Sequence, residues 1–335
     1  MLEGLYLGFF RFIFVPEADG VVLPGWKNKI FKHETFKEIL HSYSCKLKGK
    51  VSCSGCYFMY RCPYAYMYCD IQERPAPQVF KTSAAPFVWK PPLEKKTDYL
   101  PGEKISFSLV LFGNGTELLD IFIKTFKDFA DTEKNGIKGK LLLKEVISEN
   151  PLTGESEDVY KSRTGEIKTP SVLVKGEDLS NWGRDKAHLT RLTIHFLSQA
   201  FLKYRTKYFG ELHFYYFFRE IMRRVISLSY LYLNFKELGV DHYSLMENAK
   251  KVEKIRDFTF VEEEKSFIQE IPEEEKGLLG KVVFGGNISE FMPLLKMGEF
   301  VHVGEKTELG YGRYRIRDDF PSKRSYKKPG QKPVT

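Results

Sequence analysis

The chain has 335 residues, of which 42% are hydrophobic and 15% aromatic, and its formal net charge is +8. This composition supports packed cores and excludes a disordered protein, and the length suffices for two domains of ordinary size. The sequence contains no run of 18 or more apolar residues, so we expect no transmembrane helix. The apolar start, residues 1–20, lacks a positive n-region and a cleavage site, and is typical of a first core strand rather than of a signal peptide.

Five positive charges lie in the last fifteen residues, which contain no acid: Lys323, Arg324, Lys327, Lys328 and Lys332. We expect residues 321–335 to be a basic disordered tail, since they combine proline, glycine and charge with almost no apolar residues. The rest of the chain carries only about +3, a balance that is compatible with a nucleic-acid partner but does not require one.

Hydrophobic periodicity in the first half predicts four strands and two helices. We expect a strand over residues 3–15, a helix from about Lys29 to Ser42, strands within 85–94 and 102–115, a helix over 116–133 and a strand over 138–148. This order is the ferredoxin-like βαββαβ unit. Residues 150–187 are polar and are typical of a linker and a hairpin.

The pattern then restarts. We expect a strand pair over 188–204 broken around Ser198, a helix of about 22 residues within 210–235, strands over 255–267 and 277–287, and a helix over 288–300 capped by Ser289. The stretch 300–316, FVHVGEKTELGYGRYRI, is interpreted as strand, glycine loop and strand. The predicted fold class is α+β, with tandem ferredoxin-like (RRM-like) domains at 1–175 and 185–320.

All five cysteines fall in an insertion at residues 45–69, after the first predicted helix. The spacing of Cys45, Cys53, Cys56 and Cys62 suits a closed thiolate site, with zinc as first choice and an iron–sulfur cluster as second. Such a site is structural, not catalytic. A disulfide framework would need an oxidising compartment, to which nothing in the sequence points. Reduced structural cysteines are the remaining alternative.

The loop near the C-terminus combines glycines with cations. Gly304, Gly310 and Gly312 permit positive φ or close backbone approach, and a loop with bare N–H groups next to cations is suited to holding phosphates. The cations are Lys306, Arg313 and Arg315. The alternative is a tight glycine hairpin on an antiparallel sheet.

This loop resembles the glycine-rich loop of the RAMP superfamily of CRISPR-associated RNA-binding proteins. From about residue 3 to residue 317 the chain is similar to the endoribonuclease that cuts precursor CRISPR RNA within its repeats, and most similar to the cysteine-bearing branch of that family. The matching pieces are LPGWKNKIF at 23–31, CPYAYMY at 62–68, PFVWKPP at 86–92, GEKISFSLVLFG at 102–113, LTRLTIHFLSQAFLKY at 189–204 and RRVISL at 223–228.

The resemblance implies cleavage of RNA without a catalytic metal or other cofactor. The 2′-hydroxyl attacks the adjacent phosphorus and leaves a 2′,3′-cyclic phosphate and a 5′-hydroxyl. Histidine suits the acid and base roles of such a reaction. The family places its histidine on or after the first helix, so His41 is the first candidate and His33 the second, with Tyr43 and Lys37 as acid or charge stabiliser. A surface or capping role is the alternative for either histidine. No paired-carboxylate motif stands out, which disfavours a two-metal nuclease.

On the long second-half helix, Arg219, Arg223 and Arg224 are further phosphate candidates; a solvated face or ion pairs are the alternative. The expected partners are CRISPR repeat RNA and other CRISPR-associated effector proteins, with no membrane, for a monomer or homodimer in the prokaryotic cytoplasm. Two other functions remain open. One is a non-catalytic RAMP scaffold that binds guide RNA in an effector complex, and the other is a metal-knuckle module whose cysteine cluster reads RNA.

Overall fold

The computed structural model describes residues 2–17, 20–23, 30, 32–69, 85–93, 96–204, 207–208, 212–233, 239–264 and 275–317. The chain divides into two compact units. The first comprises residues 1–182, 222–240 and 306–310, and the second comprises 183–221, 241–305 and 311–335. The predicted domains, 1–175 and 185–320, are continuous, whereas each unit takes in separate pieces of the chain. The tail at 321–335 lies outside the described residues.

The first unit contains an antiparallel sheet in the order β3-β5-β1-β6-β7, with β8 paired to β1. The first, second, third and fourth core strands along the chain are β1, β3, β5 and β6, so this order is ferredoxin-like. Its strands are β1 (Tyr6–Pro16), β3 (Phe87–Lys90), β5 (Ile105–Phe112), β6 (Leu141–Glu149), β7 (Ser156–Lys161) and β8 (Val174–Lys175). The helices are α1 (Glu34–Ser44), α2 (Pro63–Tyr68) and α3 (Leu119–Asp131).

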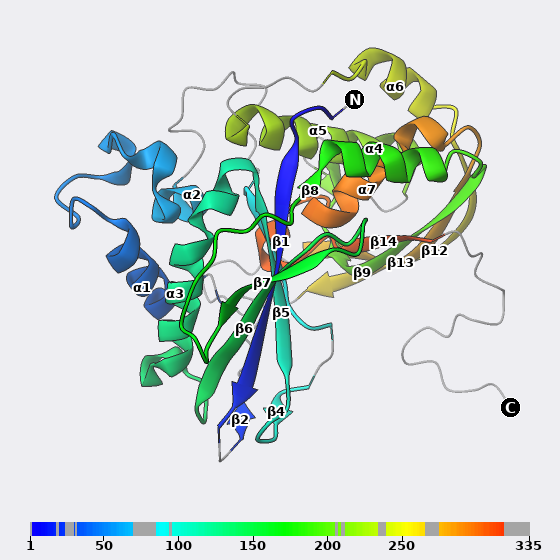
Figure 1. Ribbon diagram of the computed structural model, residues 1–335. Helices are drawn as coiled ribbons and strands as arrows, with labels where there is room; N and C mark the ends of the chain where they lie inside the picture. Colours follow the sequence, from blue (N-terminus) through cyan, green and yellow to red (C-terminus); the bar gives the residue numbers. More distant parts are fainter. Residues whose placement is uncertain are drawn as a thin grey trace, which may run out of the picture. The chain divides into compact units, whose positions relative to one another are not determined.

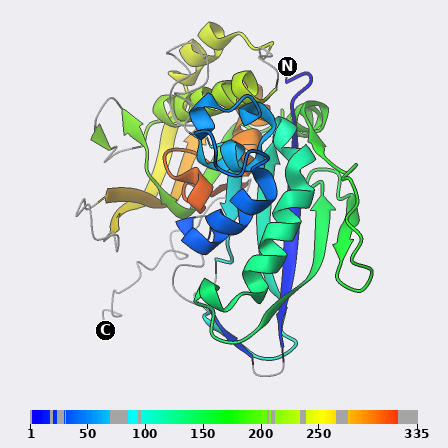
Figure 2. The ribbon, with the colours of Figure 1, turned by 90° about the vertical axis from the view of Figure 1, so that its left-hand side faces the viewer.

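An aromatic cluster joins this sheet to its helices. The ring of Trp89 is stacked on that of Phe107 at 5.0 Å and on that of Phe126 at 5.5 Å. From α1, Phe36 packs edge-on to Phe126, so α1 and α3 cover the same face of the sheet (Figure 1). Figure 2 shows these two helices in front of the strands.

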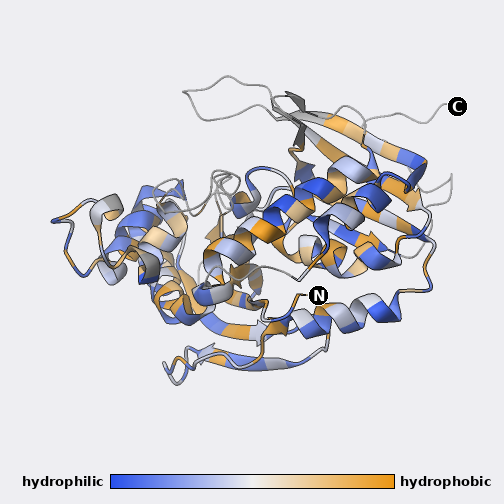
Figure 3. Cartoon of the chain, turned by 90° about the horizontal axis from the view of Figure 1, so that it is seen from above, coloured by the Kyte–Doolittle hydropathy of each residue, from blue (hydrophilic) through white to orange (hydrophobic). Residues whose placement is uncertain are grey.

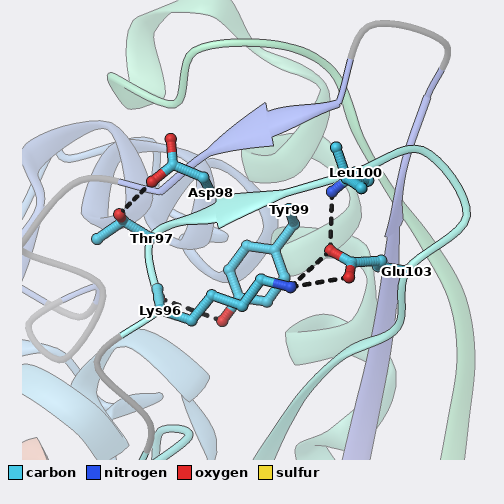
Figure 4. Close-up of polar contacts among 6 residues, drawn as sticks. All are labelled: Lys96, Thr97, Asp98, Tyr99, Leu100 and Glu103. Atoms are coloured by element: carbon cyan, nitrogen blue, oxygen red, sulfur yellow. Dashed lines mark hydrogen bonds and ion pairs between the residues drawn. The ribbon is translucent and has the colours of Figure 1, made fainter.

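A short two-stranded ladder pairs β2 (Val21–Val22) with β4 (Asp98–Tyr99). The turn after β4 is closed by Glu103, whose carboxylate accepts hydrogen bonds from Lys96 Nζ at 2.8 Å and from the Leu100 N–H at 2.8 Å (Figure 4). The Tyr99 hydroxyl donates to the Lys96 carbonyl at 3.3 Å. The hydrogen bond from Lys96 lowers the pKa of Glu103, and the Leu100 N–H adds to the effect.

The second unit repeats the ferredoxin-like order. Its antiparallel sheet runs β12-β13-β9-β14, with β9 (Arg191–Ala200), β12 (Glu253–Glu264), β13 (Glu275–Gly285) and β14 (Tyr314–Arg317). Two strands of two residues, β10 (Lys203–Tyr204) and β11 (Lys207–Tyr208), pair with each other. The helices are α4 (Gly176–Asp185), which begins in the first unit, α5 (Phe214–Tyr232), α6 (His242–Ala249) and α7 (Met292–Val301).

The first part of α5 packs with α7 on this second sheet. Phe214 contacts Phe284 of β13 at 5.2 Å, and Phe217 contacts Tyr314 of β14 at 5.2 Å. A Cβ on Gly298 of α7 would lie 2.3 Å from the Tyr314 hydroxyl, so only glycine permits this approach. Figure 3 shows that the helices carry both hydrophobic and hydrophilic residues, as amphipathic elements do. No helix among the described residues is long and apolar enough to cross a membrane.

The tandem ferredoxin-like prediction is confirmed, but several local predictions are wrong. The first helix begins at Glu34, not near Lys29. The hairpin expected within 150–187 is present, since β7 pairs with β6, but the stretch also contains β8 and the helix α4 in place of a linker. The expected strand pair around Ser198 is one strand, β9, whose register with β13 shifts between Phe196 and Ala200. Ser289 opens a 3₁₀ turn and hydrogen-bonds Asn287 instead of capping α7.

The segment expected as a strand before the glycine loop is also helical. Phe300 and Val301 form the last turn of α7, where both are buried. Their strand propensity is weak against the burial that the helix provides. The glycine loop is therefore entered from a helix and left through a strand, β14.

Candidate active site

The helix α1 presents three of its polar side chains in one line. Glu34, Lys37 and His41 are spaced by three and then four residues, which places them on one face. Lys37 Nζ forms an ion pair with Glu34 at 2.6 Å. Glu34 lies in the first turn and His41 in the last, an arrangement that suits the helix dipole.

The short helix α2 brings an aromatic ring against His41. Tyr64 follows Pro63, which occupies a first-turn position where its missing N–H costs no hydrogen bond. The ring centroids of His41 and Tyr64 lie 4.9 Å apart at an interplanar angle of 81°. Burial raises the pKa of the Tyr64 hydroxyl, and the charge of Lys37 acts in the opposite direction. His41, Lys37 and Tyr64 therefore form a cluster, which we call the α1–α2 cluster.

The two other residues predicted for catalysis point elsewhere. Tyr43 lies two residues beyond His41, on the opposite side of α1, and its hydroxyl donates to Asp128 of α3 at 2.5 Å. This hydrogen bond raises the pKa of Tyr43. His33 precedes α1 and packs edge-on to Phe129 of α3 at 5.5 Å. Both contacts tie α1 to α3, and neither residue joins the α1–α2 cluster.

A small cavity of about 30 Å³ adjoins His41, and all four predicted metal ligands line it: Cys45, Cys53, Cys56 and Cys62. The Gly49 N–H donates to Cys45 Sγ at 3.3 Å, as backbone amides do around metal-bound thiolates. Burial raises the pKa of the Cys62 thiol. Among the described residues, no three His, Cys, Asp or Glu side chains are already arranged to hold a metal, and none of the five cysteines forms a disulfide. The four thiols suit a metal by their chemistry and line one cavity.

The glycine loop uses its amides internally, contrary to the expectation of bare N–H groups. The Gly312 N–H donates to the Gln199 carbonyl at 2.7 Å and the Gly310 N–H to the Thr307 carbonyl at 3.0 Å. A Cβ on Gly312 would lie 1.8 Å from the Val303 oxygen, and one on Gly304 2.5 Å from the Phe201 oxygen. These glycines are required for close backbone packing, and the amides of Gly310 and Gly312 already donate to carbonyls.

The predicted phosphate-binding cations differ in exposure. Arg315 and Arg223 are exposed, whereas Lys306, Arg313 and Arg219 are half-buried. Arg219 forms an ion pair with Glu220 at 3.0 Å, and burial lowers the pKa of Arg313. The prediction that Arg224 contacts RNA phosphates directly is wrong. This side chain is buried, its Nη2 donates to the Ala85 carbonyl at 3.2 Å, and burial lowers its pKa to about 10.

A cavity of about 580 Å³ lies in the first unit, and none of the residues of the α1–α2 cluster line it. Its rim carries Glu3, Glu117 and Glu177 against a single cation, Lys175. Negative charge of this kind repels phosphate. We therefore do not assign this cavity to RNA.

A family model for an N-terminal domain, AF_1859_N, matches residues 5–172, which is half of the chain. The model of the CRISPR-associated endoribonuclease Cas6 matches residues 194–314. The chain belongs to the Cas6-like CRISPR-associated proteins.

Solved structures share the fold of this Cas6-like protein. A Cas6 product complex is 15% identical with a TM-score of 0.54, over 93% of this chain and 100% of that one. A partial Cas6-RT-Cas1–Cas2 complex and a Cas6-RT-Cas1–Cas2 complex are each 13% identical with TM-scores of 0.55, over 94% of this chain. The chain spans 46% and 29% of the length of those two chains. No curated protein matches it.

Sequence reasoning missed Tyr64 as a functional candidate in this Cas6-like protein. Tyr64 lies 23 residues after His41, and no periodicity connects two residues across an irregular insertion. A second missed feature, the cluster of cations in the cysteine insertion, could have been found from the sequence. Residues 39–69 contain no Asp or Glu but four cations: Lys46, Lys48, Lys50 and Arg61.

Proposed function

We propose that this Cas6-like protein cleaves CRISPR repeat RNA by attack of a 2′-hydroxyl on the adjacent phosphorus, without a catalytic metal. The observation that carries the proposal is the α1–α2 cluster, where an imidazole, a phenol and an ammonium group gather. Transesterification of RNA needs a proton acceptor, a proton donor and a cation for the extra phosphorane charge. The cluster offers one group for each need.

His41 is the proposed base and Tyr64 the proposed acid. The base takes the 2′-OH proton as the 2′-oxygen bonds to phosphorus, and the acid protonates the 5′-oxygen as its bond to phosphorus breaks. The products are a 2′,3′-cyclic phosphate and a 5′-hydroxyl. Lys37, on the same face of α1, is suited to stabilise the charge on the non-bridging oxygens. His33 and Tyr43 have contacts with α3 and take supporting places in this proposal.

RNA is held, in this proposal, by side chains rather than by loop amides. Arg315 and Arg223 are exposed and are the leading phosphate contacts, with Lys306, Arg313 and Arg219 as further ones. Gly304, Gly310 and Gly312 fix the shape of the loop.

We further propose that Cys45, Cys53, Cys56 and Cys62 bind one structural zinc ion. Their common cavity and the N–H···S hydrogen bond to Cys45 support this proposal. Thiolate sulfurs from four cysteines are a standard tetrahedral zinc set, and an iron–sulfur cluster is the second choice. The ion would hold the insertion that carries Tyr64 and thus act on catalysis only through position.

The proposed partner is CRISPR repeat RNA. Two chains that share the fold are described as Cas6-RT-Cas1–Cas2 complexes, and association with other CRISPR proteins is part of the same proposal. A monomeric or homodimeric state remains a prediction.

Two RNAs test the reaction type. One is the repeat RNA and the other carries a single 2′-deoxy substitution at the cut site, both incubated with the protein in EDTA. Cleavage of the first alone, with a cyclic phosphate end, is the expected result. Tight binding of both RNAs with no cleavage would reject the enzyme and favour the RNA-binding scaffold.

A further inference from the structure

The insertion between α1 and α2 presents a surface that the proposed reaction does not use. We define it as the insertion patch: Lys46, Lys48, Lys50, Tyr57 and Arg61, all of which are exposed. Figure 1 shows the segment between α1 and α2 as a loop that projects away from α3. The patch is therefore accessible to a ligand on the surface of the first unit.

The patch is uniformly cationic. No acid occurs between Glu38 and Asp70, and within the described part of the chain Lys48, Lys50 and Arg61 form no ion pair. Elsewhere in the first unit some exposed lysines form ion pairs, as Lys96 does with Glu103 and Lys140 with Glu17. Four cations without an acidic neighbour attract a polyanion and release its counterions on binding.

The backbone is built to present these lysines. Lys48 and Gly49 both have positive φ, at 50° and 73°, and the Lys50 N–H donates to the Leu47 carbonyl at 3.1 Å. This is a tight turn of two left-handed residues. A lysine in the left-handed region is strained, so the turn keeps a cation where asparagine or glycine would fit more easily.

An aromatic platform adjoins the turn. Tyr57 is 75% exposed, which is unusual for so large a ring. Its ring contacts that of Phe58 at 4.4 Å, and Lys46 Nζ lies 5.1 Å from the Phe58 centroid. Phe58 and Lys46 line the cysteine cavity, so the platform is anchored to the insertion and does not depend on a ligand for its position.

We propose that the insertion patch binds unpaired nucleotides of the RNA that flanks the cleaved repeat. Lysine and arginine side chains would track the phosphates while Tyr57 stacks on a base, which is the combination that single-stranded nucleic-acid sites use. The proposal rests on the proposed RNA-cleaving function and adds the part of the substrate that the α1–α2 cluster does not explain. A folded acidic protein is the competing partner, because protein interfaces also use exposed tyrosines; the test below distinguishes the two.

The test compares the affinity of the full chain for two RNAs: the repeat alone, and the repeat extended by about ten unpaired nucleotides. The measured quantity is the affinity advantage of the extended RNA, at several salt concentrations. We expect Tyr57→Ala to reduce this advantage by about fivefold or more. We expect Lys48→Ala/Lys50→Ala to reduce it as well, and to make the salt slope for the extended RNA shallower by about 1.4.

Matched variants on other surfaces serve as controls. Tyr243→Ala removes a ring that is 78% exposed, and Lys104→Ala/Lys134→Ala removes two exposed lysines; neither should change the advantage. Thermal melting establishes that every variant folds.

Two results would overturn the proposal. Wild-type protein with equal affinity for the two RNAs has no flank site. The second result is that variants in the insertion patch keep the full affinity advantage of the extended RNA, or lose the same affinity for both RNAs. Either outcome shows that the patch does not bind the flank, and full retention would favour a protein partner. Wild-type protein that binds neither RNA would instead reject the proposed function, and this inference with it.

Discussion

The imidazole of His41 lies edge-on to the phenol ring of Tyr64, with the ring centroids 4.9 Å apart. One ring comes from the last turn of α1, before the cysteine insertion, and the other from the first turn of α2, within the insertion. Because Tyr43 is held by Asp128 on the far side of α1, the structure separates two tyrosines that the sequence does not distinguish.

Removing one hydroxyl at a time tests this separation. Tyr64→Phe keeps the ring contact with His41 but removes the proton donor, so cleavage should slow by about 10²-fold or more while RNA affinity is retained. Tyr43→Phe should leave the cleavage rate near that of the wild type and reduce the free energy of unfolding by about 1 kcal/mol, since it removes one hydrogen bond. Single-turnover rates and thermal melting measure the two effects. The reverse pattern would make Tyr43 the acid.

Two adjacent arginines of α5 should behave oppositely. Arg224→Ala leaves the Ala85 carbonyl without its donor and removes a buried side chain, and should reduce the free energy of unfolding by about 1–3 kcal/mol. Arg223→Ala, at an exposed position, should weaken RNA binding and reduce its salt slope, with little effect on stability. RNA affinity that falls with Arg224→Ala alone, in protein shown to be folded, would contradict the assignment.

Gly312 is required by packing as well as by its backbone angle. An added Cβ would lie 1.8 Å from the Val303 oxygen at φ +68°, so Gly312→Ala should reduce the free energy of unfolding by more than about 2 kcal/mol. Gly154→Ala is the control, because its φ is +81° but no atom lies within 4 Å of the added Cβ. It should cost only the backbone strain, about 1 kcal/mol. Equal losses in denaturant titrations would show that close packing is not the reason for Gly312.

If the proposed zinc ion is bound, substitutions of Cys53 and Cys69 should have different effects on metal content. Cys53 lines the shared cavity and Cys69 does not, so Cys53→Ser should abolish the bound zinc and lower the melting temperature, while Cys69→Ser should retain the metal. Metal content by mass spectrometry of the purified protein gives the answer. Protein with no zinc whose melting temperature is unaffected by chelator would leave the cysteines as reduced structural residues.

The contribution of Glu103 to the stability of the folded protein should decrease as the pH falls. Its pKa is lowered in the folded state, first by the hydrogen bond from Lys96, so its contribution is present above the unfolded value of about 4.3. It is lost as the pH falls through the folded value. Glu103→Gln should therefore lower the melting temperature at pH 7 and make less difference at pH 3. Glu166→Gln, at an exposed glutamate, should make little difference at either pH.

The order of strands and helices along the chain could be predicted from the sequence, because strands and amphipathic helices differ in the period of their hydrophobic residues. Ile105, Phe107 and Leu109 alternate along β5 as a half-covered strand does. The helix α4 was missed because its sequence, GEDLSNWGRD, contains few apolar residues. Its Leu179 is nevertheless fully buried, and a single anchor of this kind leaves no periodic signal.

The candidate active site could be predicted from the sequence only in part. The resemblance to a known family pointed to His41 and Lys37, and a helical spacing of four residues puts them on one face. The contact with Tyr64 depends on how an irregular insertion folds back. Likewise the burial of Arg224, next to exposed Arg223, follows from the path of another segment over α5 and not from any local pattern.

The central claim is that His41, and not His33, carries the proton transfer. The most direct measurement is the single-turnover cleavage rate of repeat RNA, in EDTA, by His41→Ala and His33→Ala, with RNA affinity measured on the same preparations. We expect His41→Ala to slow cleavage by about 10²–10⁴-fold at unchanged affinity, and His33→Ala to cleave at close to the wild-type rate. Wild-type cleavage by His41→Ala, or loss of cleavage in His33→Ala alone, would contradict the claim.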